Sequence, residues 1–369
     1  MMKKIMIIGG LGSSLLRFRG ELIKSWLEKG YRVTALAPGR EAGGELKSLG
    51  VAYYTIPLRR TGMNPLHDFM VWVKIIWLLK RERTDYLFLY TVKPVIYGSL
   101  AAVPWRRVKV FSMITGLGYV FSATGVGTLQ KLVIFLYRLA LKRNEKVFFQ
   151  NPDDEALFKE KKLVSDNQVA RVNGSGVNLT YFQPESLPEG AIQFLLIARL
   201  LAEKGIREYV QAARILRARY SEPQYALVGW AFENNPAAIG PDEIERWRKE
   251  GVVEIFDETE DVRPFIAGSS VYVLPSYREG TPRTVLEAMA MGRPVVTTDT
   301  PGCRETVKEG FNGFLVPVKD PGALAEAMEK FILEPGLVAS MGKASRSMAV
   351  EKYDVHKVNR VINETMGLL

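Results

Sequence analysis

Two glutamates in the second half of the chain lie at a spacing that suits the binding of a phosphorylated sugar. Glu279 stands between a β-rich stretch and a helical pattern, and Glu287 falls on that helix. Thr281 is expected as the N-cap and Pro282 as the first helical residue. A helix start attracts phosphate, so carboxylates on either side of it can bind sugar and ribose hydroxyls. The alternative is an ordinary loop glutamate and a surface helical glutamate.

Two cations lie in the segment Ala198–Gly205, where a strand gives way to a helical pattern. Arg199 is expected at the strand end and Lys204 at the helix start. Cleavage of a nucleoside diphosphate sugar leaves extra negative charge on the diphosphate, and cations stabilise that charge as it develops. The chain has no Asp-x-Asp motif for a metal, so these two side chains are candidates for that role. A pair of solvated basic residues is the alternative.

The glycine-rich segment Gly9–Ser14 resembles a dinucleotide-binding loop, but Leu15 stands where the third glycine belongs. No acidic residue ends the second strand, where the sequence has Pro38–Arg40. The pattern therefore argues against NAD binding, although the glycines still allow close approach of the backbone to a ligand.

Histidine and cysteine chemistry is sparse. His67 and His356 are the only histidines and lie far apart, which excludes a histidine-based metal site and a Ser-His-Asp triad. The acidic run Asp257–Asp261 is interpreted as a solvated loop and helix cap. The one cysteine, Cys303, cannot form an internal disulfide, so we expect a reducing compartment and a packing role for it. We expect no cofactor and no metal.

The 369 residues alternate between short β-rich runs and helical patterns, which predicts two doubly wound α/β domains. The expected strands are Lys4–Ile8, Arg32–Ala37, Val51–Ile56, Tyr86–Tyr90, Val108–Met113 and Lys146–Gln150, then Gln193–Ile197, Tyr225–Val228, Val252–Phe256, Val271–Leu274, Pro294–Thr298 and Gly313–Val316. The expected helices include Leu15–Glu28, Pro65–Lys80 and Leu129–Arg143. Residues 1–180 and 185–349 are the predicted domains, joined by the polar segment Asn173–Pro184, with ligands at the carboxyl ends of the strands in a cleft between them.

Charge is unevenly spread, which bears on partners. The net charge is +10, but residues 1–180 hold 28 Lys and Arg against 13 Asp and Glu. No nucleic-acid recognition motif accompanies this excess, so a membrane surface or a phosphorylated substrate is favoured over nucleic acid. The apolar runs are too short to span a bilayer, and the N-terminus is interpreted as a first strand. Two stretches, Asn64–Arg83 and Gln130–Arg143, combine aromatics with cations and suit an interfacial helix; ordinary core helices are the alternative.

The second half of the chain resembles the family 4 retaining glycosyltransferases of GT-B fold. The matching segments, in order, are Ala198-Arg-Leu with Lys204-Gly205, Leu227-Val-Gly229, Leu274–Arg283 with Glu287, Pro294-Val-Val-Thr297 and Asn312–Val316. Residues 350–369 look like the helix that crosses back onto the first domain in this fold. A narrower likeness, to enzymes that extend undecaprenyl-diphosphate-linked amino sugars with N-acetylgalactosamine, rests on Leu15–Arg19, Thr115–Gly118 and Gly302–Glu305.

The resemblance implies a role for each matching residue. Arg199 and Lys204 would bind the donor diphosphate and, with Glu279 near the reacting carbon, carry the catalysis. Many family members have a histidine where this chain has Thr115, which puts a histidine-assisted step in doubt. The implied donor site is Gly12, Arg199, Lys204, Gly229, Glu254, Ile255, Glu279, Gly280, Thr281, Arg283 and Glu287. The expected acceptor contacts are Arg17, Arg19, Lys93 and Thr115.

The expected activity is transfer of a hexose or N-acetylhexosamine from a UDP-sugar to a polyprenyl-diphosphate-linked glycan, with retention and without a metal. We expect this to occur in the cytoplasm, at the inner face of an anionic membrane. A nucleotide-sugar 2-epimerase of the same architecture is the alternative within enzymes, although the scarcity of histidine speaks against it. A non-catalytic subunit that binds nucleotide sugar is the third hypothesis.

Overall fold

The computed structural model describes residues 2–59, 64–117, 127–229, 235 and 237–368. The chain forms two compact units, Met1–Ser175 with His356–Leu369, and Gly176–Val355. The division falls inside the segment expected as a linker. That segment is not an extended connection, because Val177 and Phe182 are buried in the second unit's core and Val177 N donates to Tyr353 O.

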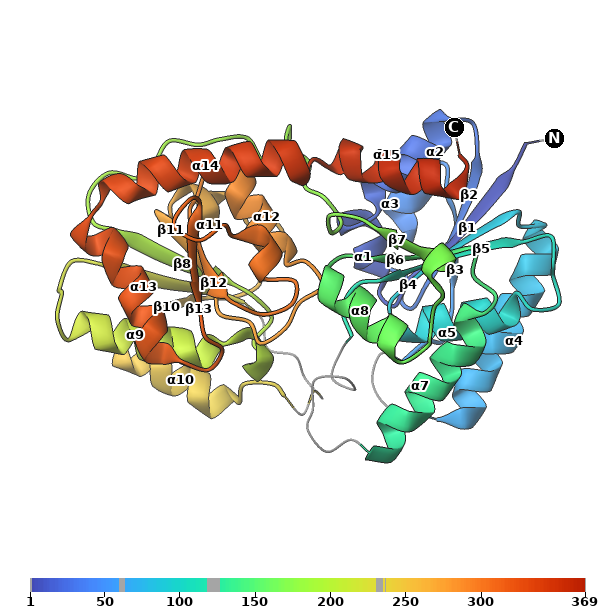
Figure 1. Ribbon diagram of the computed structural model, residues 1–369, viewed down its shortest axis with the longest axis horizontal. Helices are drawn as coiled ribbons and strands as arrows, with labels where there is room; N and C mark the ends of the chain where they lie inside the picture. The colour runs from blue at the N-terminus through green and yellow to red at the C-terminus, as the bar shows by residue number, and fades with distance from the viewer. Residues whose placement is uncertain (1, 60–63, 118–126, 230–234, 236, 369) are drawn as a thin grey trace. The chain divides into compact units, whose positions relative to one another are not determined.

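The first unit is built on a parallel seven-stranded sheet in the order β3-β2-β1-β4-β5-β6-β7 (Figure 1). The predicted doubly wound architecture is confirmed, and the first six strands agree with the prediction to within one residue at each end. The bounds are β1 Lys4–Ile8, β2 Arg32–Ala37, β3 Ala52–Thr55, β4 Tyr86–Tyr90, β5 Lys109–Ile114, β6 Lys146–Phe149 and β7 Val169–Arg171.

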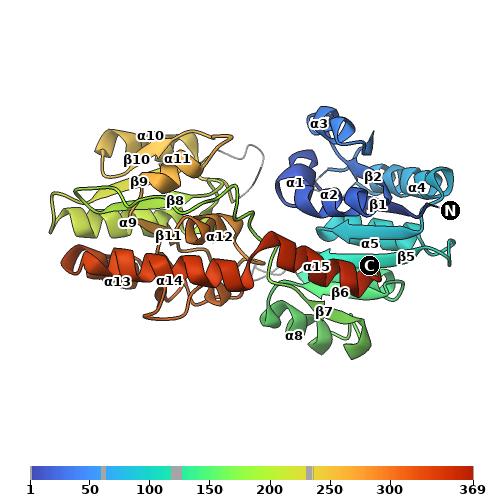
Figure 2. The ribbon, with the colours of Figure 1, turned by 90° about the horizontal axis from the view of Figure 1, so that it is seen from above.

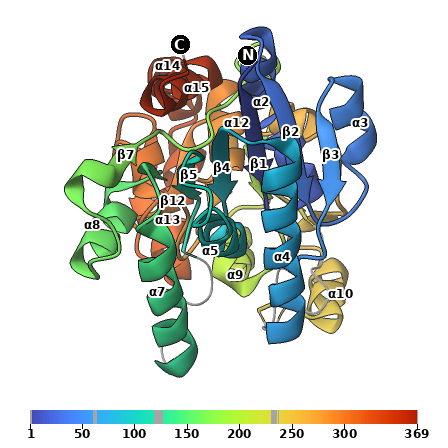
Figure 3. The same cartoon turned by 90° about the vertical axis from the view of Figure 1, so that its right-hand side faces the viewer.

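Helices cover both faces of this sheet, because successive side chains of each strand point to opposite faces. Met6 and Ile8 of β1 join the core beneath α4, α5 and α7, whereas Ile5 and Ile7 join the core that contains α2 and α15. Figure 3 shows α5 between α4 and α7. The helix bounds are α1 Gly12–Arg17, α2 Gly20–Glu28, α3 Gly43–Ser48, α4 Pro65–Glu82, α5 Val92–Ala101, α7 Gly127–Leu141, α8 Pro152–Glu160 and α15 Val355–Met366.

The prediction of one helix over Leu15–Glu28 is wrong, since the structure has two helices that meet at Phe18 and Arg19. Arg19 leaves the helical region, with φ −125° and ψ 0°. Its side chain is 1% exposed and its guanidinium lies 5.2 Å from the centre of the Tyr90 ring. A break at this position turns a charged side chain inward, and helical periodicity alone could not reveal it.

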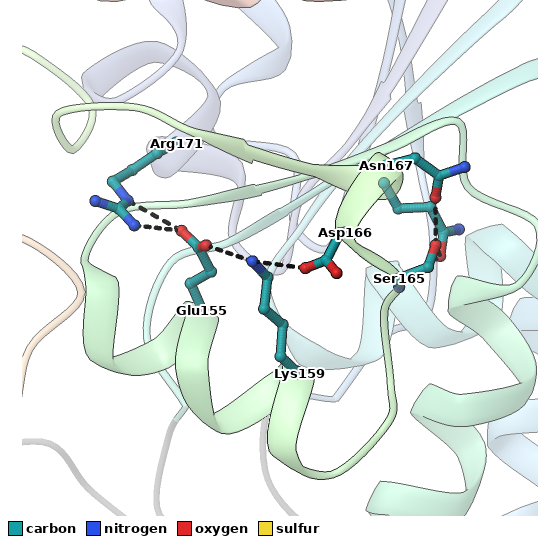
Figure 4. A network of polar contacts seen from close by, with 7 residues as sticks. Glu155, Lys159, Ser165, Asp166, Asn167 and Arg171 are labelled. Carbon is teal, nitrogen blue, oxygen red and sulfur yellow. Dashed lines mark hydrogen bonds and ion pairs between the residues drawn. The ribbon is translucent and has the colours of Figure 1, made fainter.

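The short edge strand β7 was not predicted, and a network of polar contacts holds it to the neighbouring helix α8 (Figure 4). Arg171 donates to Glu155 Oε2 at 2.7 Å. Lys159 lies 3.0 Å from Glu155 and 2.9 Å from Asp166. Burial disfavours ionisation of Glu155, but the hydrogen bonds from Arg171 and Lys159 outweigh it and hold its pKa below the usual value.

The second unit is built on a parallel six-stranded sheet in the order β10-β9-β8-β11-β12-β13. All six strands were predicted, with bounds that differ by two residues at most. They are β8 Gln193–Ile197, β9 Gln224–Val228, β10 Glu254–Phe256, β11 Val271–Leu274, β12 Val295–Thr298 and β13 Gly313–Val316. The helices are α9 Ile206–Arg217, α10 Pro241–Glu250, α11 Arg263–Ala267, α12 Arg283–Ala290, α13 Pro321–Leu333 and α14 Gly336–Lys352. Helix α9 packs beside α13, and α12 lies alongside α14 (Figures 1 and 2).

The end of the chain returns to the first unit, in line with the expected crossover. Trp26 of α2 donates its indole N–H to Asn363 of α15 at 2.7 Å, and Lys29 donates to the carbonyl of Leu368. Val358, Ile362 and the last turn of α15 complete the core on that face. Among the residues that the structure describes, no helix combines the length and apolar character needed to cross a membrane.

Candidate functional site

The strand order of the second unit brings the two predicted charged segments together. Strands β8 and β11 are neighbours, and the chain leaves them in opposite directions along the sheet. Such a point, at the carboxyl ends of the strands, is where doubly wound folds bind ligands. Arg199 follows β8 and Glu279 follows β11. Residues 80 positions apart in the sequence therefore lie at the same edge of the sheet, after neighbouring strands.

Lys204 occupies a different local structure from the one predicted. It ends a 3-10 turn, Ala202–Lys204, and Gly205 separates it from α9. Gly205 has φ 71°, and a Cβ there would lie 2.1 Å from the carbonyl oxygen of Pro275. Only glycine allows this approach between the loops that follow β8 and β11. The lysine is thus placed against the loop between β11 and α12, which carries Glu279 and is called the glutamate loop below, rather than at a helix start.

Glu279 is held by side chains from both of these loops. Lys204 forms an ion pair with its Oε1, and Ser276 donates to the same oxygen at 2.9 Å. Both members of the ion pair retain about one-seventh of their side-chain exposure, 14% for the lysine and 15% for the glutamate. A charged pair so largely removed from water needs this close partnering to be stable. The pair leaves the lysine at the ligand-binding edge of the sheet.

The loop after β12 fixes the backbone of Glu279. Its amide donates to Pro301 O at 3.0 Å. Gly302 has φ 83°, and a Cβ there would lie 2.2 Å from Glu279 O and 2.5 Å from Gly280 O. Sequence reasoning assigned Gly302 to a resemblance motif without a physical role. The structure supplies one, because no other residue fits against the glutamate loop.

Cys303 follows in this loop and is completely buried, which agrees with the packing role expected for it. Burial raises the pKa of its thiol to about 11, and the negative charge of Glu279 adds to the effect. Hydrogen bonds with the surrounding threonines oppose the shift. The thiol is therefore protonated at neutral pH, which does not suit a nucleophile.

The helix that carries Glu287 begins one residue later than predicted. Pro282, with φ −72° and ψ 112°, is the N-cap of α12, and no side-chain hydrogen bond caps the helix. The prediction of Thr281 as the N-cap and Pro282 as the first helical residue is therefore wrong. Glu287 is buried and accepts from Arg283 Nε at 2.8 Å. This carboxylate thus lies just over one turn into α12.

Three further residues predicted for the donor site, Gly229, Glu254 and Ile255, lie after β9 or within β10 of the same sheet. Gly229 follows β9, and a Cβ there would lie 2.3 Å from the carbonyl oxygen of Ala198 beside Arg199. Glu254 and Ile255 lie in the edge strand β10, paired with Ala226 and Leu227. Gly229 is therefore at the ligand-binding edge, whereas Glu254 lies at the start of its strand.

The first unit has its own strand-order reversal, between β1 and β4. Gly12 opens α1 after β1, and a Cβ on it would lie 3.2 Å from Pro38 O. Lys93, after β4, pairs with Asp68 at 3.1 Å and is largely buried. Thr115 follows β5 and is half-buried. These three residues share one edge of this sheet; the end of the glycine loop that begins at Thr115 lies outside the described residues.

Two residues predicted to contact the acceptor, Arg17 and Arg19, differ in burial at the end of α1. Arg17 is exposed. Arg19 is buried and donates to Met113 Sδ at 2.8 Å, while its guanidinium lies over Tyr90. This placement does not support a direct contact between Arg19 and an acceptor. It explains instead how the break between α1 and α2 is stabilised, because a guanidinium over an aromatic face gains cation–π attraction.

Two residues that contact the predicted site residues were not identified from the sequence. Ser276 belongs to the same motif as Glu279, three residues before it, and its burial was the missing signal. Asp68 lies 25 residues before Lys93, and only the packing of α4 beside α5 brings them together. Within the described parts of the chain, no group of three His, Cys, Asp or Glu side chains is placed to hold a metal ion.

In the comparison with known proteins, each of the two units is matched by a family of glycosyltransferases. The family "Glycosyl transferases group 1" matches residues 178–348, and "Glycosyl transferase 4-like" matches residues 12–151. The chain is 26% identical, over 95% of each chain, to the N,N'-diacetylbacillosaminyl-diphospho-undecaprenol alpha-1,3-N-acetylgalactosaminyltransferase of Campylobacter jejuni. It is 24% identical to the UDP-Gal:alpha-D-GlcNAc-diphosphoundecaprenol alpha-1,3-galactosyltransferase of Escherichia coli, over 83% of this chain and 81% of that one.

Solved structures share the fold. The Anabaena protein HepE in complex with UDP and glucose superposes with a TM-score of 0.80, at 18% identity and with all of both chains covered. The resemblance recognised in the sequence motifs is confirmed by these matches, and so is the two-domain α/β architecture.

Proposed function

Since the chain is a glycosyltransferase made of a glycosyl transferase 4-like domain and a glycosyl transferases group 1 domain, we propose that it transfers a sugar from a UDP-sugar to a lipid-linked glycan. The proposed sugar is a hexose or an N-acetylhexosamine. The proposed reaction retains the anomeric configuration and needs no metal ion. The observation that carries the proposal is the convergence of Arg199, Lys204 and Glu279 at the strand-order reversal of the second unit.

The donor diphosphate is proposed to take the place of Glu279 as the partner of Lys204. A diphosphate brings more charge to the lysine than one carboxylate, and Arg199 adds a second cation from the adjacent loop. As the bond between the anomeric carbon and the phosphate oxygen breaks, both cations stabilise the charge left on the diphosphate. Glu279, already oriented by Ser276, then accepts hydrogen bonds from sugar hydroxyls.

The rest of the donor is proposed to extend from this edge of the sheet to the short edge strand β10. Glu287 binds the ribose hydroxyls, Gly229 allows the backbone of the loop after β8 to approach the ligand, and Glu254 and Ile255 lie against the uracil. Two findings support a UDP-sugar: a similar protein named as a UDP-galactose-dependent transferase, and the structure of HepE with UDP and glucose.

The acceptor is proposed to bind the first unit near Arg17, Lys93 and Thr115, whereas Gly12 is proposed to line the donor diphosphate from the side of the first unit. The two transferases named above act on sugars linked to undecaprenol through a diphosphate, which supports an acceptor of this class. In same-face attack, the acceptor hydroxyl forms the new bond on the side from which the diphosphate departs. The departing phosphate oxygen takes the hydroxyl proton, so the step requires no histidine, consistent with Thr115 at this position.

A lipid-linked acceptor requires contact with a membrane surface, and we place it at α4 and α7. Helix α4 leaves Leu66, Phe69, Met70, Val73 and Trp77 exposed, and α7 leaves Leu132, Phe135 and Leu139 exposed. Each set repeats every three or four residues, so it forms one stripe along its helix. Such stripes, on a unit with a net positive charge, support peripheral binding to the cytoplasmic face of an anionic membrane.

One experiment separates this proposal from its alternatives. The purified protein is incubated with a panel of UDP-sugars and a polyprenyl-diphosphate-linked amino sugar, with and without EDTA. A lengthened lipid-linked glycan, formed equally with chelator, is the expected product. Formation of a 2-epimer would assign the epimerase. Donor binding detected by thermal shift without any product would indicate the binding subunit. Abolition of transfer by EDTA, with recovery on adding a divalent metal, would contradict the metal-independent mechanism.

A further inference from the structure

A basic hollow lies in the first unit, at the edge of the sheet opposite the carboxyl ends of the strands. It has a volume of about 840 Å³ and is formed by the end of α4 and by the connection between α5 and β5. Its described lining includes five cations and no carboxylate. The lining residues are Trp77, Lys80, Arg81, Arg83, Pro104, Trp105, Arg106 and Arg107.

Little negative charge offsets these cations. Glu82 pairs with Arg81 at 3.7 Å, but it also accepts from the Tyr54 hydroxyl at 2.8 Å. Arg81 lies over the Trp77 ring at 4.9 Å. Cations close to a helix C-terminus are expected, because they stabilise the helix dipole. That explanation covers Lys80 and Arg81 but not Arg106 and Arg107, which come from a separate connection.

The structure holds that connection against the hollow. Arg143, after α7, donates through Nη2 to the carbonyl oxygens of Trp105 at 3.1 Å, Arg106 at 3.2 Å and Val108 at 2.5 Å. The guanidinium of Arg143 therefore fixes the backbone of this connection. The side chains of Arg106 and Arg107 are exposed and line the hollow beside α4. Mutual repulsion of five cations in one hollow costs stability, so an anionic occupant would relieve it.

The hollow continues the exposed apolar stripe of α4. The stripe residues Leu66, Phe69, Val73 and Trp77 are spaced so that the next positions on the same face are Lys80 and Arg81. Trp77 is 50% exposed and belongs to both features. In a helix that lies at the membrane surface, the apolar stripe can contact acyl chains, while Trp77 and the cations at the helix end lie at the level of the interface and the phosphates.

We propose that this hollow binds the phosphate of an anionic phospholipid headgroup, and so fixes α4 in the plane of the membrane. The site rests on the membrane contact proposed above for α4 and goes beyond it, because it names the cations that recognise the headgroup and the tryptophan that anchors the helix. Phosphate suits guanidinium groups, which donate two parallel hydrogen bonds to its oxygens. The continuity with the apolar stripe favours a lipid over a soluble phosphate compound or nucleic acid.

The test compares Arg106→Gln/Arg107→Gln with a control of equal net charge, Arg32→Gln/Lys47→Gln. The control residues are exposed and do not line the hollow. Sedimentation is measured with phosphatidylcholine vesicles, with and without phosphatidylglycerol, at low and high salt. The hollow variant is expected to lose roughly tenfold or more in affinity for the anionic vesicles only. The control should lose much less, and salt should reduce the difference. Trp77→Ala should weaken binding to both kinds of vesicle.

Other outcomes would overturn the proposal. Equal losses in the two double variants would mean that net charge alone acts. A second outcome is that the hollow variant binds vesicles as the wild type does but no longer gains thermal stability from inorganic phosphate or no longer binds a short DNA duplex. That outcome would mean that the hollow binds a soluble anion and not a lipid headgroup. Transfer to a short-chain, water-soluble acceptor is measured in parallel and should be unchanged in all variants. If the protein transfers no sugar to any acceptor, the proposed function is wrong, but the vesicle comparison still tests the lipid-binding hollow.

Discussion

The loops around Glu279 and the surface formed by α4 and α7 handle charge and apolar groups in opposite ways. In the loops, Lys204 and Glu279 form a largely buried pair, and glycine contacts lock the backbone around them. On the helical surface, cations crowd one hollow with little compensation, and large apolar side chains remain in solvent.

The difference indicates two kinds of binding. A preorganised loop cluster suits a small charged ligand whose reacting bond must be placed accurately, because misplacement by about 1 Å can cost 10²-fold in rate. An exposed, uncompensated surface suits an extended partner that supplies the missing contacts itself. Variants in the loops should therefore change chemistry, and variants on the helical surface should change attachment.

The largest expected effect comes from removing the cations of the loop cluster. Arg199→Ala or Lys204→Ala should lower turnover by about 10²-fold or more, because each removes charge stabilisation of roughly 3 kcal/mol. The measurement is steady-state transfer with saturating UDP-sugar. Lys249→Ala removes an exposed lysine of α10 and serves as the control, which should retain wild-type turnover. Equal turnover in all three variants would remove the catalytic assignment.

Gly302→Ala tests whether the locked backbone matters. The added methyl would collide with the carbonyls of Glu279 and Gly280, so transfer should fall roughly tenfold to 100-fold. Gly310→Ala is the matched control, because Gly310 has φ 70° but open space around its Cβ position. The adjacent thiol of Cys303 reports on opening of the loop. Alkylation by iodoacetamide at pH 7 should be very slow in the wild type and faster in Gly302→Ala, but not in Gly310→Ala.

The two glutamates should separate catalysis from binding. Glu279→Gln keeps the shape of the side chain but removes the partner charge of Lys204, so turnover should fall by about tenfold with a smaller change in donor affinity. Glu287→Ala should mainly weaken donor binding, since it removes a buried carboxylate oriented by Arg283. Isothermal titration with UDP-sugar and initial rates distinguish the two. Wild-type rates and affinities in both variants would mean that Glu279 and Glu287 take no part in donor binding or transfer.

The smallest effect is expected from the ion-pair network around Glu155, which lies outside the proposed catalytic site. The pKa of Glu155 is lowered in the folded state, so its network stabilises the protein above the unfolded pKa of about 4.3, and that stabilisation is lost as the pH falls through the folded pKa. Glu155→Gln should lower the free energy of unfolding at pH 7 by about 1 kcal/mol or less. Urea unfolding at pH 7 and in acid, with Glu145→Gln as control, measures the difference. A loss that persisted unchanged in acid would mean that packing, not charge, is responsible.

Much of the fold was predictable because buried parallel strands are short, continuous and apolar. Strands such as β1, β8 and β11 match their predicted bounds without change. Edge strand β7 escaped notice, since it has three half-exposed or exposed residues and little apolar pattern. The break at Arg19 was equally invisible, because it depends on an aromatic ring supplied by β4, about 70 residues later.

The sequence by itself predicted the resemblance to glycosyltransferases, the two α/β domains and the charged residues that follow β8 and β11. Local spacing sufficed because each motif follows one strand and precedes one helix. Only the tertiary structure decided that Lys204 binds Glu279, that Gly302 braces the glutamate loop, and that Arg19 points inward while Arg106 and Arg107 join the end of α4. These relations join segments far apart in the chain, and they depend on strand order and loop contacts that no local pattern records.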